Sequence, residues 1–188
     1  MPWIRTIEPE QATGELADAY AWQARRLGRP TEFTQLGSLA PELVHARLTL
    51  YRASERLESA LTPLQKVVIA YVTSVLNETP HCASQVRLKL YELGADDAFV
   101  AALDAGRYDE LPPAEAALAT YARRLTRDVG SVQASDVEAL RAAGFGDLEI
   151  LDANNQCAHL NYVNRVANGL GLRDEVGVDF AAFAAIPA

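Results

Sequence analysis

Apolar residues recur along this chain at helical spacing, and helix-starting and helix-ending residues separate the runs. Thr62 and Pro63 open the run TPLQKVVIAYVTSVLN, where threonine suits the N-cap and proline suits the first turn. Gly94 follows CASQVRLKLYEL in the position where glycine ends helices. The β-branched run KVVIAYVTSV is also compatible with a buried strand, but its capped start and its length favour a buried helix.

Two further segments carry the same signals. Leu118, Tyr121 and Leu125 follow one helical face in the segment after a pair of prolines. Asp147 then suits the N-cap of a long helix that runs to about Gly169. The pattern predicts seven or eight helices and no strand. We find no linker, so we predict an all-α, compact multi-helix fold with a single domain over residues 1–188.

The composition narrows the class of protein. The chain has 188 residues, 49% of them apolar, and a formal net charge of −8. This charge disfavours a nucleic-acid surface, and no apolar run is long enough to span a bilayer. The N-terminus lacks the apolar region of a signal peptide, so we expect a cytoplasmic protein. Two cysteines in a reducing compartment are expected to be free thiols.

The segment LNETPHCASQVRLKL, residues 76–90, carries the first candidate chemistry. Thr79 and Pro80 suit the N-cap and first position of a helix, which places His81 and Cys82 in its first turn. The helix dipole there favours a thiolate, and His81 could serve as a general base. The alternative is structural, with Cys82 as a small buried apolar residue and His81 as an exposed residue at the helix start.

A polar stripe follows one face of the long C-terminal helix. Its members are spaced by three or four residues: Asn154, Cys157, Asn161, Asn164 and Asn168. Beside it lies an apolar face that suits the core, formed by Leu151, Ala158, Tyr162, Val166 and Leu170. Asparagine is a mediocre helix former, so the stripe needs a reason. Either the amides bind helix ends or a subunit partner, or they line a ligand pocket.

The histidines do not suggest a metal site. His159 lies two residues from Cys157 and therefore points to another side of the helix. This spacing disfavours a metal bound by both side chains. His45 has no obvious partner in the sequence, and we interpret it as structural.

Several stretches together resemble the alkylhydroperoxidase D-like / carboxymuconolactone decarboxylase-like superfamily, in its uncharacterised peroxidase-related branch. They are IEPEQATGELADAY, LTPLQKVVIAYVTSVLNETPHC, DELPPAEAALATYARRLTRDVGSVQASDVEALRAAGFGDLEIL and NYVNRVANGLG, which cover nearly the whole chain. The resemblance implies an all-helical fold and a homo-oligomer, either a dimer or a larger assembly.

Redox members of that superfamily use the motif C-x-x-C-x-x-x-H and a glutamate on the preceding helix. The resemblance places the first cysteine at Thr79, the second at Cys82, the histidine at Val86 and the glutamate at Val67. Threonine cannot form the disulfide of a dithiol cycle, and valine cannot transfer a proton. We therefore expect that the dithiol peroxidase mechanism is lost.

Three functions remain open. The first is a repurposed enzyme that acts on a small organic molecule, with His81 and Cys82 as catalytic candidates. The second is a non-catalytic binder or a structural homo-oligomer, and the third is a thiol peroxidase that pairs Cys82 with Cys157. The resemblance and the stripe give these candidate substrate-binding residues: Thr79, Val86, Val67, Cys157, Asn161 and Asn164. We expect no cofactor, no metal, and no nucleic-acid or membrane partner.

Overall fold

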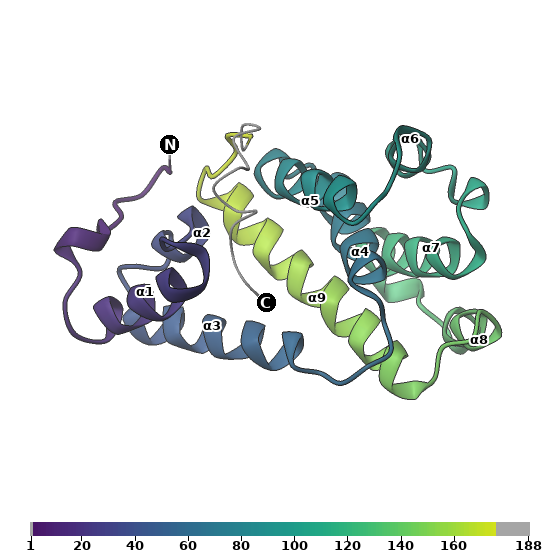
Figure 1. Ribbon diagram of the computed structural model, residues 1–188, viewed down its shortest axis with the longest axis horizontal. Coiled ribbons are helices and arrows are strands. Elements are labelled where there is room, and N and C mark those ends of the chain that lie inside the picture. Colours follow the sequence, from purple (N-terminus) through teal and green to yellow (C-terminus); the bar gives the residue numbers. More distant parts are fainter. Residues whose placement is uncertain (1, 176–188) are drawn as a thin grey trace.

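The computed structural model describes residues 2–175, and every regular element in this range is helical (Figure 1). The all-α prediction is confirmed. The α-helices are α1 (Gly14–Leu27), α2 (Glu32–Gln35), α3 (Pro41–Glu55), α4 (Pro63–Leu76), α5 (Pro80–Glu92), α6 (Asp97–Ala105), α7 (Pro113–Arg127), α8 (Ala134–Ala142) and α9 (Asp147–Gly169). Three short 3-10 helices accompany them: η1 (Pro9–Gln11), η2 (Tyr108–Glu110) and η3 (Val129–Ser131).

Local capping explains where two of the long helices begin. At the start of α4, Thr62 Oγ1 accepts from the backbone N–H of Gln65 at 3.2 Å, and Gln65 Oε1 accepts from the Thr62 N–H at 3.0 Å. Helix α9 begins at Asp147, but the N-cap residue is Gly146. The predicted aspartate cap is wrong because the Glu149 carboxylate reaches back instead, accepting from the Gly146 N–H at 3.0 Å.

Helix α4 is the centre of the main core. The β-branched segment predicted to be a buried helix is one, with Val68, Ile69 and Val72 almost completely inaccessible. α4 packs against α5, α7 and α9. Because a central helix is covered on several sides, it needs apolar residues around most of its circumference. This explains why its sequence lacks a clear polar face.

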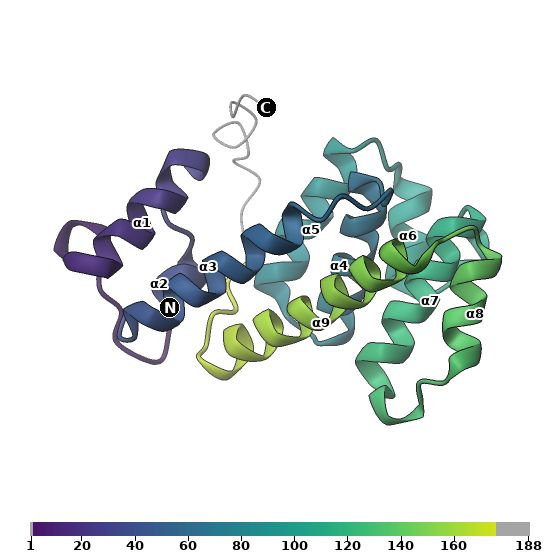
Figure 2. The same ribbon diagram turned by 90° about the horizontal axis from the view of Figure 1, so that it is seen from below.

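Helices α1 to α3 form one end of the molecule, and α9 runs from this end to the opposite one (Figures 1 and 2). A second apolar cluster joins α1 to α3 through Leu16, Ala19, Tyr20 and Val44. α3 also contacts α9 directly. A third, smaller cluster lies where α2, the start of α5 and the end of α9 meet, and it contains Cys82.

Candidate functional site

The turn between α4 and α5 positions the Cys82 segment. Asn77 ends α4, and Glu78 follows in the left-handed region, with φ = 51°. Thr79 is the N-cap of α5 as predicted, although its hydroxyl does not cap the helix. The Thr79 hydroxyl instead accepts a hydrogen bond from the Asn168 amide at 3.0 Å. α5 therefore starts from a strained turn that α9 holds in place.

Cys82 lies in the first turn of α5, as predicted, and its side chain is only 7% exposed. Its buried neighbours in the third cluster are Leu36, Ala167 and Leu172. Burial raises the pKa of the Cys82 thiol to about 11, and a side-chain hydrogen bond with Asn164 partly opposes this rise. The sequence position at the helix start favoured a lowered pKa, whereas burial of the thiol raises it.

His81 is buried beside Cys82, but its ring nitrogens have other partners. Nδ1 lies 2.9 Å from the carbonyl oxygen of Asp174, and Nε2 lies 3.0 Å from the amide nitrogen of Gln85. A neutral ring that donates from Nδ1 and accepts at Nε2 satisfies both contacts. The expected exposed position is wrong. The geometry does not support the predicted role of His81 as a base for the Cys82 thiol.

The other residues carried over by the resemblance fall in different surroundings. Thr79 is buried at the α4–α5 turn. Val67 on α4 and Val86 on α5 are partly buried against the main core cluster, whereas Cys82 belongs to the third cluster. Apolar side chains packed in this way cannot relay a proton. Thr79, where the resemblance places the first cysteine, therefore presents a hydroxyl, and Val67 and Val86, where it places the relay residues, are apolar packing residues.

Cys157 is fully buried in the main core and is a free thiol, as is Cys82. Its sulfur lies 3.4 Å from the hydroxyls of Thr73 and Thr126. Cys82 interacts with Asn164, which lies about 10 Å further along α9 than Cys157 at 1.5 Å per residue. A disulfide requires Cα atoms within about 7 Å. The structure does not bring the two thiols together as a pair.

The asparagine stripe faces α4 and the α4–α5 turn. The Asn77 amide donates to Oδ1 of Asn161 at 2.9 Å and to Oδ1 of Asn164 at 3.1 Å. Asn164, which is completely buried, donates to Ser74 Oγ at 3.3 Å. These amides bind the end of a neighbouring helix, which is the structural alternative that the sequence left open.

Asn168 extends this contact to the strained turn. Its amide nitrogen lies 2.9 Å from the carbonyl oxygen of Asn77 and 3.4 Å from that of Glu78, in addition to the Thr79 hydroxyl. The last carbonyl groups of a helix have no partner within the helix and need one elsewhere. Asn168 supplies it, and in doing so it positions the residues that precede Cys82.

The apolar face expected beside the stripe is mostly not in the core. Leu151, Ala158 and Tyr162 are exposed, whereas Val166 and Leu170 pack against the third cluster. The prediction for the first three residues is wrong because α4 and α7 pack against the other side of α9. The polar stripe faces inward, and part of the apolar face is turned toward solvent.

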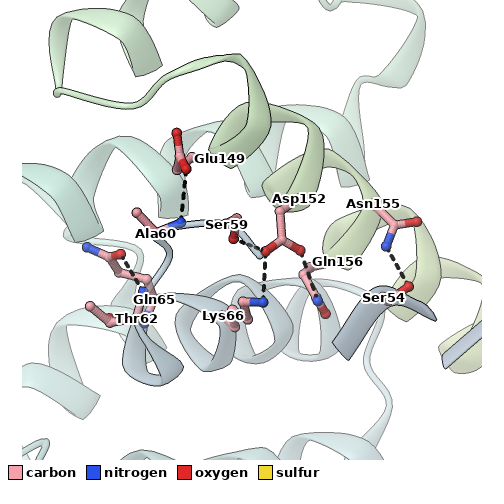
Figure 3. Close-up of polar contacts among 10 residues, drawn as sticks. All are labelled: Ser54, Ser59, Ala60, Thr62, Gln65, Lys66, Glu149, Asp152, Asn155 and Gln156. Carbon is pink, nitrogen blue, oxygen red and sulfur yellow. Dashed lines mark hydrogen bonds and ion pairs between the residues drawn. The ribbon is translucent and has the colours of Figure 1, made fainter. Parts of the chain in front are cut away.

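A second polar cluster, which sequence reasoning missed, lies near the start of α9 (Figure 3). The carboxylate of Asp152 is completely buried and lies 2.8 Å from the Lys66 ammonium on α4. Ser59 donates to the same carboxylate oxygen, and Gln156 donates to the other at 3.2 Å. Glu149 accepts from the Ala60 N–H at 2.9 Å. These contacts attach the α3–α4 loop to α9. Sequence reasoning missed the cluster because no motif distinguishes Asp152 from the exposed acidic residues.

Two surface grooves lie away from Cys82. One, of about 250 Å³, lies between α1 and α3 and is lined by residues that include Trp22, Arg52 and the exposed His45. The other, of about 310 Å³, lies beside η2, α7 and α8. Residues 2–175 contain no group of three or more side chains placed to hold a metal ion. In the same range, no helix is long and apolar enough to cross a membrane.

Solved structures share this fold. A peroxidase-related protein from Ralstonia eutropha JMP134, described as an alkylhydroperoxidase AhpD core, is 19% identical, with a TM-score of 0.82 over 100% of this chain and 98% of that chain. A peroxidase-related protein from Silicibacter sp. TM1040 is 25% identical, with a TM-score of 0.73 over 83% and 82%. The chain therefore has the all-helical alkylhydroperoxidase D-like fold, as its sequence resemblance implied.

A third similar structure carries a ligand. It is a cysteine-to-alanine variant of the debrominase Bmp8 in complex with 2,3,4-tribromopyrrole, 14% identical, with a TM-score of 0.75 over 100% of both chains. No protein-family model and no curated protein matches the sequence of this chain. At these identities the structural matches establish the shared fold.

Proposed function

We propose that this chain binds a small organic molecule against the Cys82 thiol and does not carry out a dithiol peroxidase cycle. The observation that carries the proposal is the environment of the thiol. Phe33 on α2 and Val163 on α9 pack against the cluster that contains Cys82, Leu36 and Leu172. Binding sites for small organic molecules are mostly apolar with a few polar groups, and this cluster offers the same combination.

The residues at the other motif positions support the loss of the dithiol cycle. A disulfide exchange needs a second sulfur, and the position three residues before Cys82 holds Thr79. The Cys157 sulfur lies beside the hydroxyls of Thr73 and Thr126. Its position on α9 is about two helical turns away from Asn164, the residue that contacts Cys82. Neither residue supplies a sulfur within reach.

The state of the thiol supports binding more than thiolate chemistry. A thiol whose pKa is about 11 is protonated at neutral pH, and the thiolate is the nucleophilic form. Because Cys82 is only 7% exposed, a ligand must displace a side chain of the cluster to reach it. The tribromopyrrole held by the debrominase supports a small aromatic ring as the class of ligand.

A repurposed enzyme is the second candidate, and the debrominase among the similar structures favours it. In this case the bound molecule would have to lower the pKa of the Cys82 thiol, since neither ring nitrogen of His81 is available to the sulfur. Turnover of an organic substrate that is abolished in Cys82→Ala but not in Cys157→Ala would identify this activity.

Calorimetric titration with 2,3,4-tribromopyrrole tests the binding proposal. We expect saturable binding to the wild type and at least about tenfold weaker binding to Val163→Phe, because the larger ring makes the cluster around Cys82 harder for a ligand to enter. Val137→Phe, a partly buried position on α8, is the matched control and should bind as the wild type does. No saturable binding, or equal loss in both variants, would contradict the proposal.

Intact mass spectrometry after mild hydroperoxide treatment tests the loss of the dithiol cycle. We expect no dithiol-reversible loss of two hydrogen atoms from the single chain, because the two thiols are held apart. Slow addition of oxygen at one sulfur is compatible with the proposal. An intramolecular Cys82–Cys157 disulfide, mapped by peptide analysis, would restore the peroxidase hypothesis.

A further inference from the structure

Helices α1 and α3 contact each other at one end of the molecule (Figure 1), and a groove of about 250 Å³ lies between them. The groove shares no lining residue with the cluster that contains Cys82. Residues spaced by three and four positions lie on one face of a helix. The side chains that line the groove follow this spacing on both helices: Asp18, Trp22 and Arg25 on α1, and His45, Thr49 and Arg52 on α3.

The base of the groove is apolar. Ala19 is buried, and Leu48 packs against the apolar cluster that joins α1 to α3. Trp22 is half-buried, so part of its indole ring is open to solvent. Binding sites for small organic molecules combine an apolar lining with a few polar groups, and a flat ring packs well against an aromatic side chain. The base of this groove therefore suits an aromatic ring.

The rim of the groove is basic, although the chain as a whole has a formal net charge of −8. Arg25 and Arg52 are both exposed at the groove, and the imidazole of His45 lies there too. Asp18 is the one acidic side chain among the described residues that line it. A cleft lined mainly by charges of one sign attracts ligands of the opposite sign. This groove therefore favours an anion on a molecule that is otherwise acidic.

The arginines and the aromatic ring lie close together. The guanidinium carbon of Arg52 is 5.9 Å from the centre of the Trp22 ring, within the range of a cation–π interaction. Arg25 follows Trp22 by three residues, just under one helical turn, on the same face of α1. A guanidinium group pairs with a carboxylate through two parallel hydrogen bonds. The groove thus presents carboxylate-binding groups beside a surface for a ring.

We propose that this groove binds a small aromatic carboxylate, at a site separate from the one at Cys82. The ring of the ligand lies against Trp22, and its carboxylate pairs with Arg52 and Arg25. Asp18 precedes Trp22 by about one turn, on the opposite side of the ring from Arg25. Its carboxylate repels a second negative charge at the far end of the ligand, so the groove selects a monoanion.

Fluorescence titration with benzoate tests this proposal on the full chain. The sequence contains two tryptophans, so Trp3→Phe leaves Trp22 as the only reporter. Trp3 is 68% exposed, and its replacement should keep the helical circular dichroism of the wild type. We expect a saturable change in Trp22 emission with benzoate. Binding should be at least about tenfold weaker for benzamide, which is neutral, and for benzene-1,4-dicarboxylate, which carries a second charge.

Variants of the two arginines locate the site. Arg25→Gln and Arg52→Gln, in the same background, should each raise the Kd for benzoate at least about fivefold, and both exposed positions tolerate the change without loss of fold. Arg127→Gln at the exposed end of α7 is the matched control, because it removes the same charge outside the groove. Val163→Phe, in the cluster around Cys82, should also leave benzoate binding unchanged.

Four results would overturn the proposal. The first is a Trp22 emission that does not change at any benzoate concentration tested. The second is equal affinity for benzoate and benzamide, which would show that the guanidinium groups are not recognised. The third is displacement of benzoate by an equal concentration of inorganic phosphate, because the arginines would then attract any anion. The fourth is an equal loss of binding in Arg127→Gln and the two groove variants.

Discussion

The two ends of α9 are fastened to α4 by different chemistry. Near the start of α9, the buried Asp152 carboxylate pairs with the Lys66 ammonium in the first turns of α4 (Figure 3). Toward the end of α9, the neutral amides of Asn161 and Asn164 accept from Asn77, the residue that ends α4. One end is held by charge and the other by uncharged hydrogen bonds.

The difference explains the state of the candidate site. A buried ion pair must offset the desolvation of both ions, and removing one partner leaves a charge without compensation. An amide network satisfies its groups without burying any charge. Cys82 lies at the amide end, among apolar side chains and Asn164, where a thiolate has little to stabilise it. The charged pair of Lys66 and Asp152 lies at the other end of the helix.

The largest expected effect is at the charged end. Lys66→Met leaves the fully buried Asp152 carboxylate unpaired and should lower the free energy of unfolding by about 3–5 kcal/mol. The double variant Lys66→Met/Asp152→Leu should recover much of this loss. Urea denaturation measures both, with Lys89→Met in an exposed ion pair as the control, expected to change stability by less than about 1 kcal/mol. Equal losses for Lys66→Met and the control would show that the buried pair does not hold the helices.

The second effect concerns the thiol at the amide end. At pH 8, a thiol with a pKa of about 11 has roughly a hundredth of the thiolate of an ordinary thiol with a pKa of 9.0. Alkylation of Cys82 should therefore rise about tenfold per pH unit through pH 9 and level off only near pH 11. Because the folded chain favours the protonated thiol, its contribution to stability is present below pH 9 and is lost between pH 9 and about 11. Alkylation that levels off at or below pH 9, followed by peptide mass mapping, would contradict the effect of burial.

The amide network should contribute less than the ion pair. Asn164→Ala removes the acceptor for Asn77 and the donor to Ser74, and should lower the free energy of unfolding by about 1–3 kcal/mol. Asn77→Ala should have a similar effect. Because the two side chains share a hydrogen bond, the double variant should lose less than the sum of the two. Additive losses in denaturation experiments would mean that the two amides act independently.

The smallest effect is a gain in stability at the turn before Cys82. Glu78 is exposed and has φ = 51°, so Glu78→Gly should relieve strain and raise the free energy of unfolding by about 0.4–1 kcal/mol. Glu138→Gly, in the right-handed helix α8, is the control and should lower it by about 1 kcal/mol. A loss of stability in Glu78→Gly would show that the carboxylate contributes more than the strain costs.

Helix boundaries were predictable because their signals are local. The threonine cap and proline at the start of α4, the prolines at the starts of α5 and α7, and the full extent of α9 follow from residues within one turn. The position of Cys82 in the first turn of α5 follows for the same reason. The pKa of the Cys82 thiol could not be predicted from nearby residues, because the apolar groups around the thiol come from α2 and from the end of α9.

The orientation of α9 could not be predicted from residues close in the sequence. The sequence of α9 has a polar side and an apolar side, which suggested that the apolar side is buried. For most of the helix the polar side is buried and the apolar side is exposed. The Asn161 and Asn164 amides can face inward because Asn77 and Ser74 are their hydrogen-bond partners. These partners lie 84 to 90 positions away in the sequence. The same is true of Asp152, whose partner Lys66 lies on another helix.

The sequence by itself predicted the all-helical fold and the starts of most helices, and it has a threonine and two valines where the resemblance places a cysteine and the proton-relay residues of a dithiol site. These properties depend on residue identity and on neighbours within about four positions. Only the tertiary structure decided which side of α9 is buried and that the Cys82 thiol is buried among apolar residues from α2 and the end of α9. Burial and satisfaction of polar groups depend on distant partners, which only the folded chain brings into contact.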